Sequence, residues 1–162
     1  MQWFKACSVG LALRLVLLAV PVLLVGCRTA PHAPLFVAAG PGWRVQEGQA
    51  LWRPGRELPE LGGELVVASH DDGRCAIQFS KTPLPLVLAQ TTRTEWLIEF
   101  PPRRMSFTGR HPPPARFAWL HLAAALTGEP LPASLGFQRK PDGGWRLENP
   151  RSGETVEGFL GP

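Results

Sequence analysis

Apolar and polar residues alternate along much of the chain from residue 43 onward, and this pattern predicts a sheet. A period of two places successive side chains on opposite faces of a strand. The alternation is cleanest where Cys75, Ile77 and Phe79 are separated by polar or small residues, and it recurs from Thr94 to Phe100. We expect further strands at 45–52, 64–69, 104–108, 135–140, 145–149 and 154–160.

Turn-forming residues separate several of these runs at short intervals. Asp72-Gly73 favours a tight hairpin, and Pro141–Gly144 and Pro150–Gly153 carry residues typical of tight turns. Strands joined by such short connections pair antiparallel. The pattern therefore predicts an antiparallel sheet of about seven to nine strands.

One segment is helical in pattern. Residues Ala115–Leu126 contain no helix breaker, follow the extended Pro112–Pro114 run and precede Gly128, a residue typical of helix ends. Apolar side chains surround this helix almost completely, so it needs cover on more than one side. We expect a mainly β (α+β) domain whose sheet is covered by one central apolar helix.

The N-terminus has the features of a secretory leader. Lys5 and Arg14 precede an apolar run, Leu15–Val25, that is short for a transmembrane helix. Leu24-Val25-Gly26-Cys27 resembles the lipobox of bacterial lipoproteins, which implies cleavage before Cys27 and acylation of its thiol. An ordinary signal peptide or a single-span anchor stays open as the alternative.

These features divide the chain into three parts. Residues 1–26 are expected to be a lipoprotein signal peptide, 27–42 a lipid-anchored flexible tether rich in Pro, Ala and Gly, and 43–162 a single β domain. Leu35-Phe36-Val37 is apolar enough to dock on that domain.

Composition narrows the classes of function. Without the two basic residues of the leader the net charge falls from +4 to +2, and the arginines are scattered, so we expect no nucleic-acid partner.

The spacing of His70, Asp71, Asp72 and Cys75 matches no zinc site, and turn formation explains it. Neither a Gly-x-Ser-x-Gly element nor a phosphate-binding glycine loop occurs, and nothing in the sequence brings Cys75 and His121 together. We expect a non-enzymatic protein without metal or cofactor.

Several motifs together resemble the LolA/LolB lipoprotein-localisation superfamily. They are Gly62-Gly63-Glu64-Leu65, the strand from Trp96 to Phe100, Pro101-Pro102-Arg103, Trp145–Asn149 and Ser152-Gly153-Glu154. The resemblance implies a strongly curved half-barrel, acyl chains or lipoproteins as cargo and a periplasmic carrier protein as partner. Arg28, in place of an aspartate, implies the periplasmic side of the outer membrane. The chain departs from this family in its short length and its single helix. We expect a monomer.

Two sets of residues are candidates for function. Trp96, Ile98, Phe100, Trp119 and Leu122 are expected to line an apolar cavity for acyl chains, although the same residues suit a packed core. Leu84 and Leu86 either form a membrane-facing loop or belong to an edge strand protected by prolines. The leading hypothesis is an acyl-chain or lipoprotein carrier. The alternative is a structural or adaptor lipoprotein with a solid core and a protein-binding face.

Overall fold

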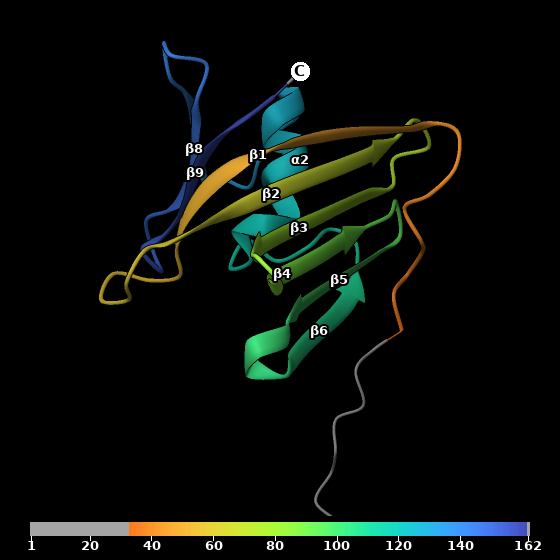
Figure 1. Cartoon of the computed structure of the whole chain (residues 1–162), viewed down its shortest axis with the longest axis horizontal. Helices are drawn as coiled ribbons and strands as arrows, with labels where there is room; N and C mark the ends of the chain where they lie inside the picture. Colours follow the sequence, from red (N-terminus) through yellow and green to blue (C-terminus); the bar gives the residue numbers. More distant parts are fainter. Residues whose placement is uncertain (1–32, 162) are drawn as a thin grey trace, which may run out of the picture. The chain divides into compact units, whose positions relative to one another are not determined.

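A computed structural model describes residues 33–161, which form a nine-stranded antiparallel sheet with a short helical segment packed on one face (Figure 1). The spatial order of the strands is β6-β5-β4-β3-β2-β1-β9-β8-β7, and the sheet is not closed. The strands are β1 (Trp43–Arg53), β2 (Leu61–His70), β3 (Cys75–Lys81), β4 (Leu84–Thr91), β5 (Glu95–Phe100), β6 (Met105–Arg110), β7 (Gly136–Arg139), β8 (Trp145–Asn149) and β9 (Glu154–Leu160).

The sheet joins two meanders through one long-range strand pair. Strands β1 to β6 follow one another in space as in sequence, and β7 to β9 form the second meander. Strand β9 pairs with β1 from Gly48 opposite Leu160 to Arg53 opposite Thr155. The helical segment between β6 and β7 therefore connects the two edge strands of the sheet.

Residues 84–91 form strand β4, which lies between β3 and β5. The edge-strand alternative for residues 82–88 therefore holds for the half of β4 that precedes Leu88. Its pairing with β5 begins only at Leu88, and residues before that pair with β3 alone. Pro85 lies in this singly paired half, where the missing backbone N–H removes no ladder bond to β5.

The helix is shorter than the sequence predicts. Residues Ala118–His121 form a 3-10 turn, η2, and only Leu122–Thr127 form the α-helix α2. Phe117, with φ −109° and ψ 85°, is not helical, and no side chain caps the first turn. The three prolines before Ala115 favour extended backbone, which delays the start of the helix. Gly128 ends it in the left-handed region (φ 80°), as expected.

The core lies between one face of the sheet and the helical segment. Its largest fully buried side chains are Trp119, Trp145, Phe79, Leu65, Ile98, Leu122, Leu147, Val87 and Val156. The Trp119 ring is central, because its centroid lies 5.1 Å from that of Phe79 and 5.9 Å from that of Trp52. A second short 3-10 turn, η1 (Pro101–Arg103), connects β5 to β6 outside this core.

Candidate functional site

The five residues expected to line an acyl-chain cavity are brought together in the core. Trp96, Ile98, Trp119 and Leu122 are buried, and Phe100 packs against them while partly exposed. Phe100 stacks on Trp52 at 6.0 Å between ring centroids, and Trp96 contacts Phe117 at 5.8 Å. None of the five lines either of the two hollows described below. All five therefore belong to the packed core or lie against it.

Two buried polar side chains tie the covering segment to the sheet. The Glu154 carboxylate accepts hydrogen bonds from Trp52 Nε1 at 3.0 Å and from the Ala118 backbone N–H at 3.3 Å. Asn149 Nδ2 donates to the Ala115 carbonyl at 3.0 Å. Burial raises the pKa of Glu154 to about 7, although both hydrogen bonds oppose this shift.

The sequence analysis missed both residues. Glu154 and Val156 point to the core from the same face of β9. The sequence feature that could have identified Glu154 is therefore a carboxylate two residues before an apolar core position.

The larger hollow is a cleft of about 1070 Å³ at the end of the sheet that carries the β2–β3 and β4–β5 turns. Ser69, Cys75 and Thr91 line it from the sheet, and His121, Ala124 and Thr127 line it from the helical segment. The space between sheet and helix is thus filled by apolar side chains in the core, whereas at this end it is open and lined by both polar and apolar side chains. A cleft of this size suits a ligand or a peptide segment.

Charges in the cleft are only partly compensated. Arg44 pairs with Asp71 at 2.6 Å, and Arg74 pairs with Asp72 at 2.8 Å. Arg93, on the β4–β5 turn, and Glu129, after α2, also line the cleft but form no ion pair with any residue from 33 to 161. An unpaired cation from the sheet side and an unpaired carboxylate from the helix side therefore face the same cleft.

The fold brings Cys75 and His121 to this cleft, although nothing in their spacing along the chain predicts it. Both are buried, and no hydrogen bond links them. Burial raises the pKa of the Cys75 thiol to about 12, with a smaller contribution from Glu129. The thiol is therefore protonated at neutral pH and is a poor nucleophile. Burial lowers the pKa of His121, and its Nε2 has no hydrogen-bond partner.

The β2–β3 turn accounts for the other polar residues of this region. Asp72 accepts hydrogen bonds from the Arg74 backbone N–H at 3.0 Å and from Arg74 Nε at 2.8 Å. His70 Nδ1 lies 2.9 Å from the Asp72 carboxylate. Within residues 33–161, no group of three or more His, Cys, Asp or Glu side chains is placed to hold a metal ion.

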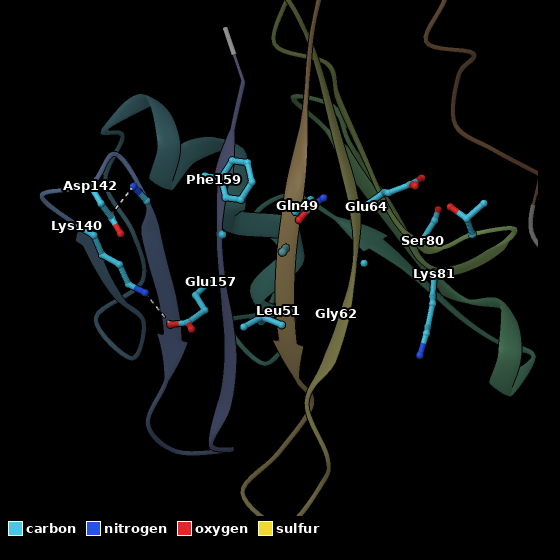
Figure 2. A pocket seen from close by; sticks show the side chains of 15 residues that line it. Gln49, Leu51, Gly62, Glu64, Ser80, Lys81, Lys140, Asp142, Glu157 and Phe159 are labelled. Carbon is cyan, nitrogen blue, oxygen red and sulfur yellow. Dashed lines mark hydrogen bonds and ion pairs between the residues drawn. The ribbon is translucent and has the colours of Figure 1, made fainter.

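A second hollow of about 710 Å³ lies on the face of the sheet opposite the helical segment (Figure 2). Figure 2 shows Leu51 and Phe159, which are 43% and 54% exposed, on the neighbouring strands β1 and β9. Lys140 and Glu157 form an ion pair at 3.2 Å along one side. Ser80 is buried where it lines this hollow, and the other polar lining residues are partly or fully exposed, so the hollow is a surface groove with apolar and charged borders.

The two leucines expected to face a membrane differ in exposure. Leu84 is 63% exposed, whereas Leu86 packs against the core. Lys81, Arg103, Arg104 and Met105 are also exposed, and η1 contacts β4. This end of the sheet therefore combines apolar and basic side chains, and it lies at the opposite end of β4 from the cleft.

Cys27 and the leader lie outside the described residues. In the part of the chain that the structure describes, no helix is long and apolar enough to cross a membrane. Comparisons with protein-family models, with curated proteins and with solved structures found no match.

Proposed function

We propose that this chain is a non-enzymatic lipoprotein of the cell envelope that acts as a structural or adaptor module. Cys27 anchors it to the outer membrane, and the domain faces the periplasm as a monomer. One observation carries the choice of adaptor over carrier: Trp96, Ile98, Trp119 and Leu122 are buried in the apolar core, Phe100 packs against it, and none of the five lines either hollow.

Lipid content tests this choice directly. We expect a soluble form lacking residues 1–27 to appear ligand-free by native mass spectrometry and to leave the emission of a fluorescent fatty acid unchanged. A bound lipid that copurifies with the protein, or saturable binding of the fatty acid, would contradict the adaptor function.

The cleft is the surface on which the adaptor binds a protein partner. Its unpaired Arg93 and Glu129 favour a partner segment that carries both charges. A photo-crosslinker at Thr92, in the intact envelope, tests this. We expect one cross-linked product that Arg93→Glu removes and that Lys140→Glu, on the other hollow, leaves intact. A product insensitive to Arg93→Glu would contradict a role of the cleft.

A carrier of acyl chains or lipoprotein cargo is the second candidate. The observation that favours it is the way the cover is held: its first turn is a 3-10 turn, and its polar contacts with the sheet come from Glu154, Asn149 and Arg139. The domain would then be a strongly curved half-barrel with a central apolar helix as lid. Opening this lid would expose Trp119 and Leu122 to cargo handed over by a periplasmic carrier protein. Fatty-acid binding that Glu154→Ala strengthens would support this candidate, and the absence of binding to both forms would contradict it.

The exposed Leu84, partly exposed Leu86 and adjacent basic residues form a membrane-contacting surface. Apolar side chains enter the interface while Lys81, Arg103 and Arg104 meet anionic headgroups. We expect the soluble form to cosediment with anionic vesicles and Leu84→Asp to bind several-fold more weakly. Phe159→Asp is the matched control, because it removes an apolar residue of similar exposure elsewhere. Equal losses for the two variants would contradict this assignment.

The anchor has a separate test. Cys27→Ala in the full chain should abolish palmitate labelling and leave the leader uncleaved. Labelling at the level of the parent protein would contradict lipid attachment at Cys27.

A further inference from the structure

The segment that precedes β1 is held on the sheet by one glutamine. The Leu35 backbone N–H donates to Gln90 Oε1 at 2.7 Å, and Gln90 Nε2 donates to the Phe36 carbonyl at 2.9 Å. Both ends of a single side-chain amide are therefore satisfied by consecutive residues of the segment. We call residues 34–37 the strap.

Aromatic and cationic groups add to this contact. The Phe36 ring stacks on Trp43 with centroids 5.4 Å apart, and the Arg74 guanidinium lies 5.6 Å from the Phe36 centroid and 5.3 Å from that of Trp43. Stacking and cation–π contacts of this kind are each attractive, so they stabilise the strap on the sheet together with the two hydrogen bonds. Trp43 is itself 5.1 Å from the His70 ring, so the strap rests on the ends of β1 and β2.

The strap lies on the face of the sheet opposite the helical segment. Ala89 belongs to the core, so its neighbour Gln90 points to the other face. Gln90 is also one residue from the end of β4, next to the β4–β5 turn. The strap is thus held near the cleft end of the sheet and away from Leu84, where β4 begins.

This position changes the length of chain available between the domain and Cys27. Cys27 precedes Leu35 by eight residues and Trp43 by sixteen. A fully extended chain spans at most about 3.5 Å per residue, so the reach from the domain is about 28 Å with the strap bound and about 56 Å with it released.

We propose that the strap is a two-state spacer that sets the distance and orientation of the domain relative to the membrane. The proposal rests on acylation of Cys27. With the strap bound, the β2–β3 and β4–β5 turns lie toward the bilayer. The Leu84 surface is about 20 Å further along β4, so it meets the membrane only if residues 27–34 run back along the sheet almost fully extended. Release of the strap frees this surface to reach the bilayer.

Amide exchange in the soluble form lacking residues 1–27 tests the strap without the anchor. We expect the Leu35 amide to be protected in the parent and to exchange about tenfold faster in Gln90→Ala, because both hydrogen bonds are lost. Gln78→Ala is the matched control: Gln78 lies on the same face but bonds to Ser80, not to the strap. Leu35 exchange at the unprotected rate in the parent would overturn the proposal.

A second variant covers the case in which Gln90→Ala unfolds. Phe36→Ala removes the stacking on Trp43 without changing the sheet, and we expect several-fold faster exchange at Leu35. Unchanged exchange at Leu35 in a folded Phe36→Ala would overturn the contribution of the aromatic contacts.

The orientation is measured on the lipidated full chain in vesicles that contain nitroxide-labelled lipid. A fluorophore is placed at Leu84→Cys or, in a separate sample, at Arg93→Cys, since Cys75 is buried and unreactive. We expect stronger quenching at position 93 than at 84 in the parent, and at least a twofold rise at 84 with Gln90→Ala. Equal quenching at 84 in both forms would overturn the spacer role. A protein that fails to remain on vesicles would instead contradict the anchor.

Discussion

Glu154 shows how a single residue links the sheet to its cover. Its carboxylate is held by Trp52 of β1 and by the backbone of η2, and 6% of the residue is exposed. A carboxylate buried in this way is stabilised mainly when it is neutral, since both contacts replace only part of the lost hydration. Burial at Cys75 has the same effect on a thiol.

The Glu154 pKa predicts a loss of stability as the pH rises. The folded pKa of about 7 lies above the ordinary value of 4.5, so the stabilisation is fully present below pH 4.5 and is lost as the pH rises through 7. The loss is on the order of 3 kcal/mol. We expect Glu154→Gln to remove this part of the slope in urea unfolding measured between pH 5 and pH 8.

Two comparisons isolate the effect. The lowered pKa of His121 acts in the opposite direction, because its stabilisation is lost as the pH falls, so the difference between parent and variant is the relevant quantity. Glu157→Gln, on the other face of β9, should retain the slope of the parent. The same slope in the parent and in Glu154→Gln would exclude Glu154 as its source.

Cys75 is predicted to be unreactive in the folded protein. The residue is 7% exposed and the pKa of its thiol is about 12, so little thiolate forms at pH 8. We expect alkylation by iodoacetamide to be at least about a hundredfold slower than for a free thiol and to recover in urea. Rapid alkylation without denaturant would show that the cleft opens to the thiol.

At the scale of elements, β1 and β9 approach each other so closely at Gly158 that no side chain fits there. A Cβ at Gly158 would lie 2.2 Å from the Gln49 carbonyl oxygen and 3.0 Å from Ala50 Cα, both parts of the β1 backbone. Because backbone atoms cannot move aside as a flexible side chain does, the pairing of the two meanders depends on glycine at this position.

Gly158→Ala is therefore expected to destabilise the domain by roughly 3 kcal/mol. The measurement is urea unfolding followed by far-UV circular dichroism. Gly55→Ala is the control, because the nearest atoms to its Cβ would be 3.7 Å away, in ordinary contact. Equal stability of the two variants would contradict close approach of β1 and β9.

For the whole molecule, one core unites elements that are distant in sequence. Trp52, Trp96, Trp119 and Trp145 come from β1, β5, η2 and β8, and all belong to the same buried cluster. The two meanders therefore share their apolar contacts, and neither has a separate core.

We expect a single cooperative transition as a consequence. Urea unfolding followed by tryptophan fluorescence and by far-UV circular dichroism should give coincident curves. An earlier transition in fluorescence alone would indicate that the cover separates before the sheet unfolds, which would favour the carrier function over the adaptor.

Local sequence pattern predicted most of the strands and two features of their connections. Alternation predicted β3 and β5, Asp72-Gly73 marked the β2–β3 turn, and Gly128 marked the end of α2, because each depends on residues close in sequence. The β4 strand was only one of two alternatives, because Pro83 and Pro85 suggested either a loop or an edge strand. The late start of the helix was missed because its 3-10 turn is fixed by burial against the sheet.

The sequence by itself determined a mainly β, hairpin-rich domain, and it predicts a lipoprotein leader before that domain. Only the tertiary structure decided that β9 pairs with β1, that Gln90 holds Leu35 and Phe36, and that Trp119 fills the core. Each of these depends on residues far apart along the chain. Residues that line a cavity and residues that pack against one another have the same apolar character, so no periodic pattern separates them.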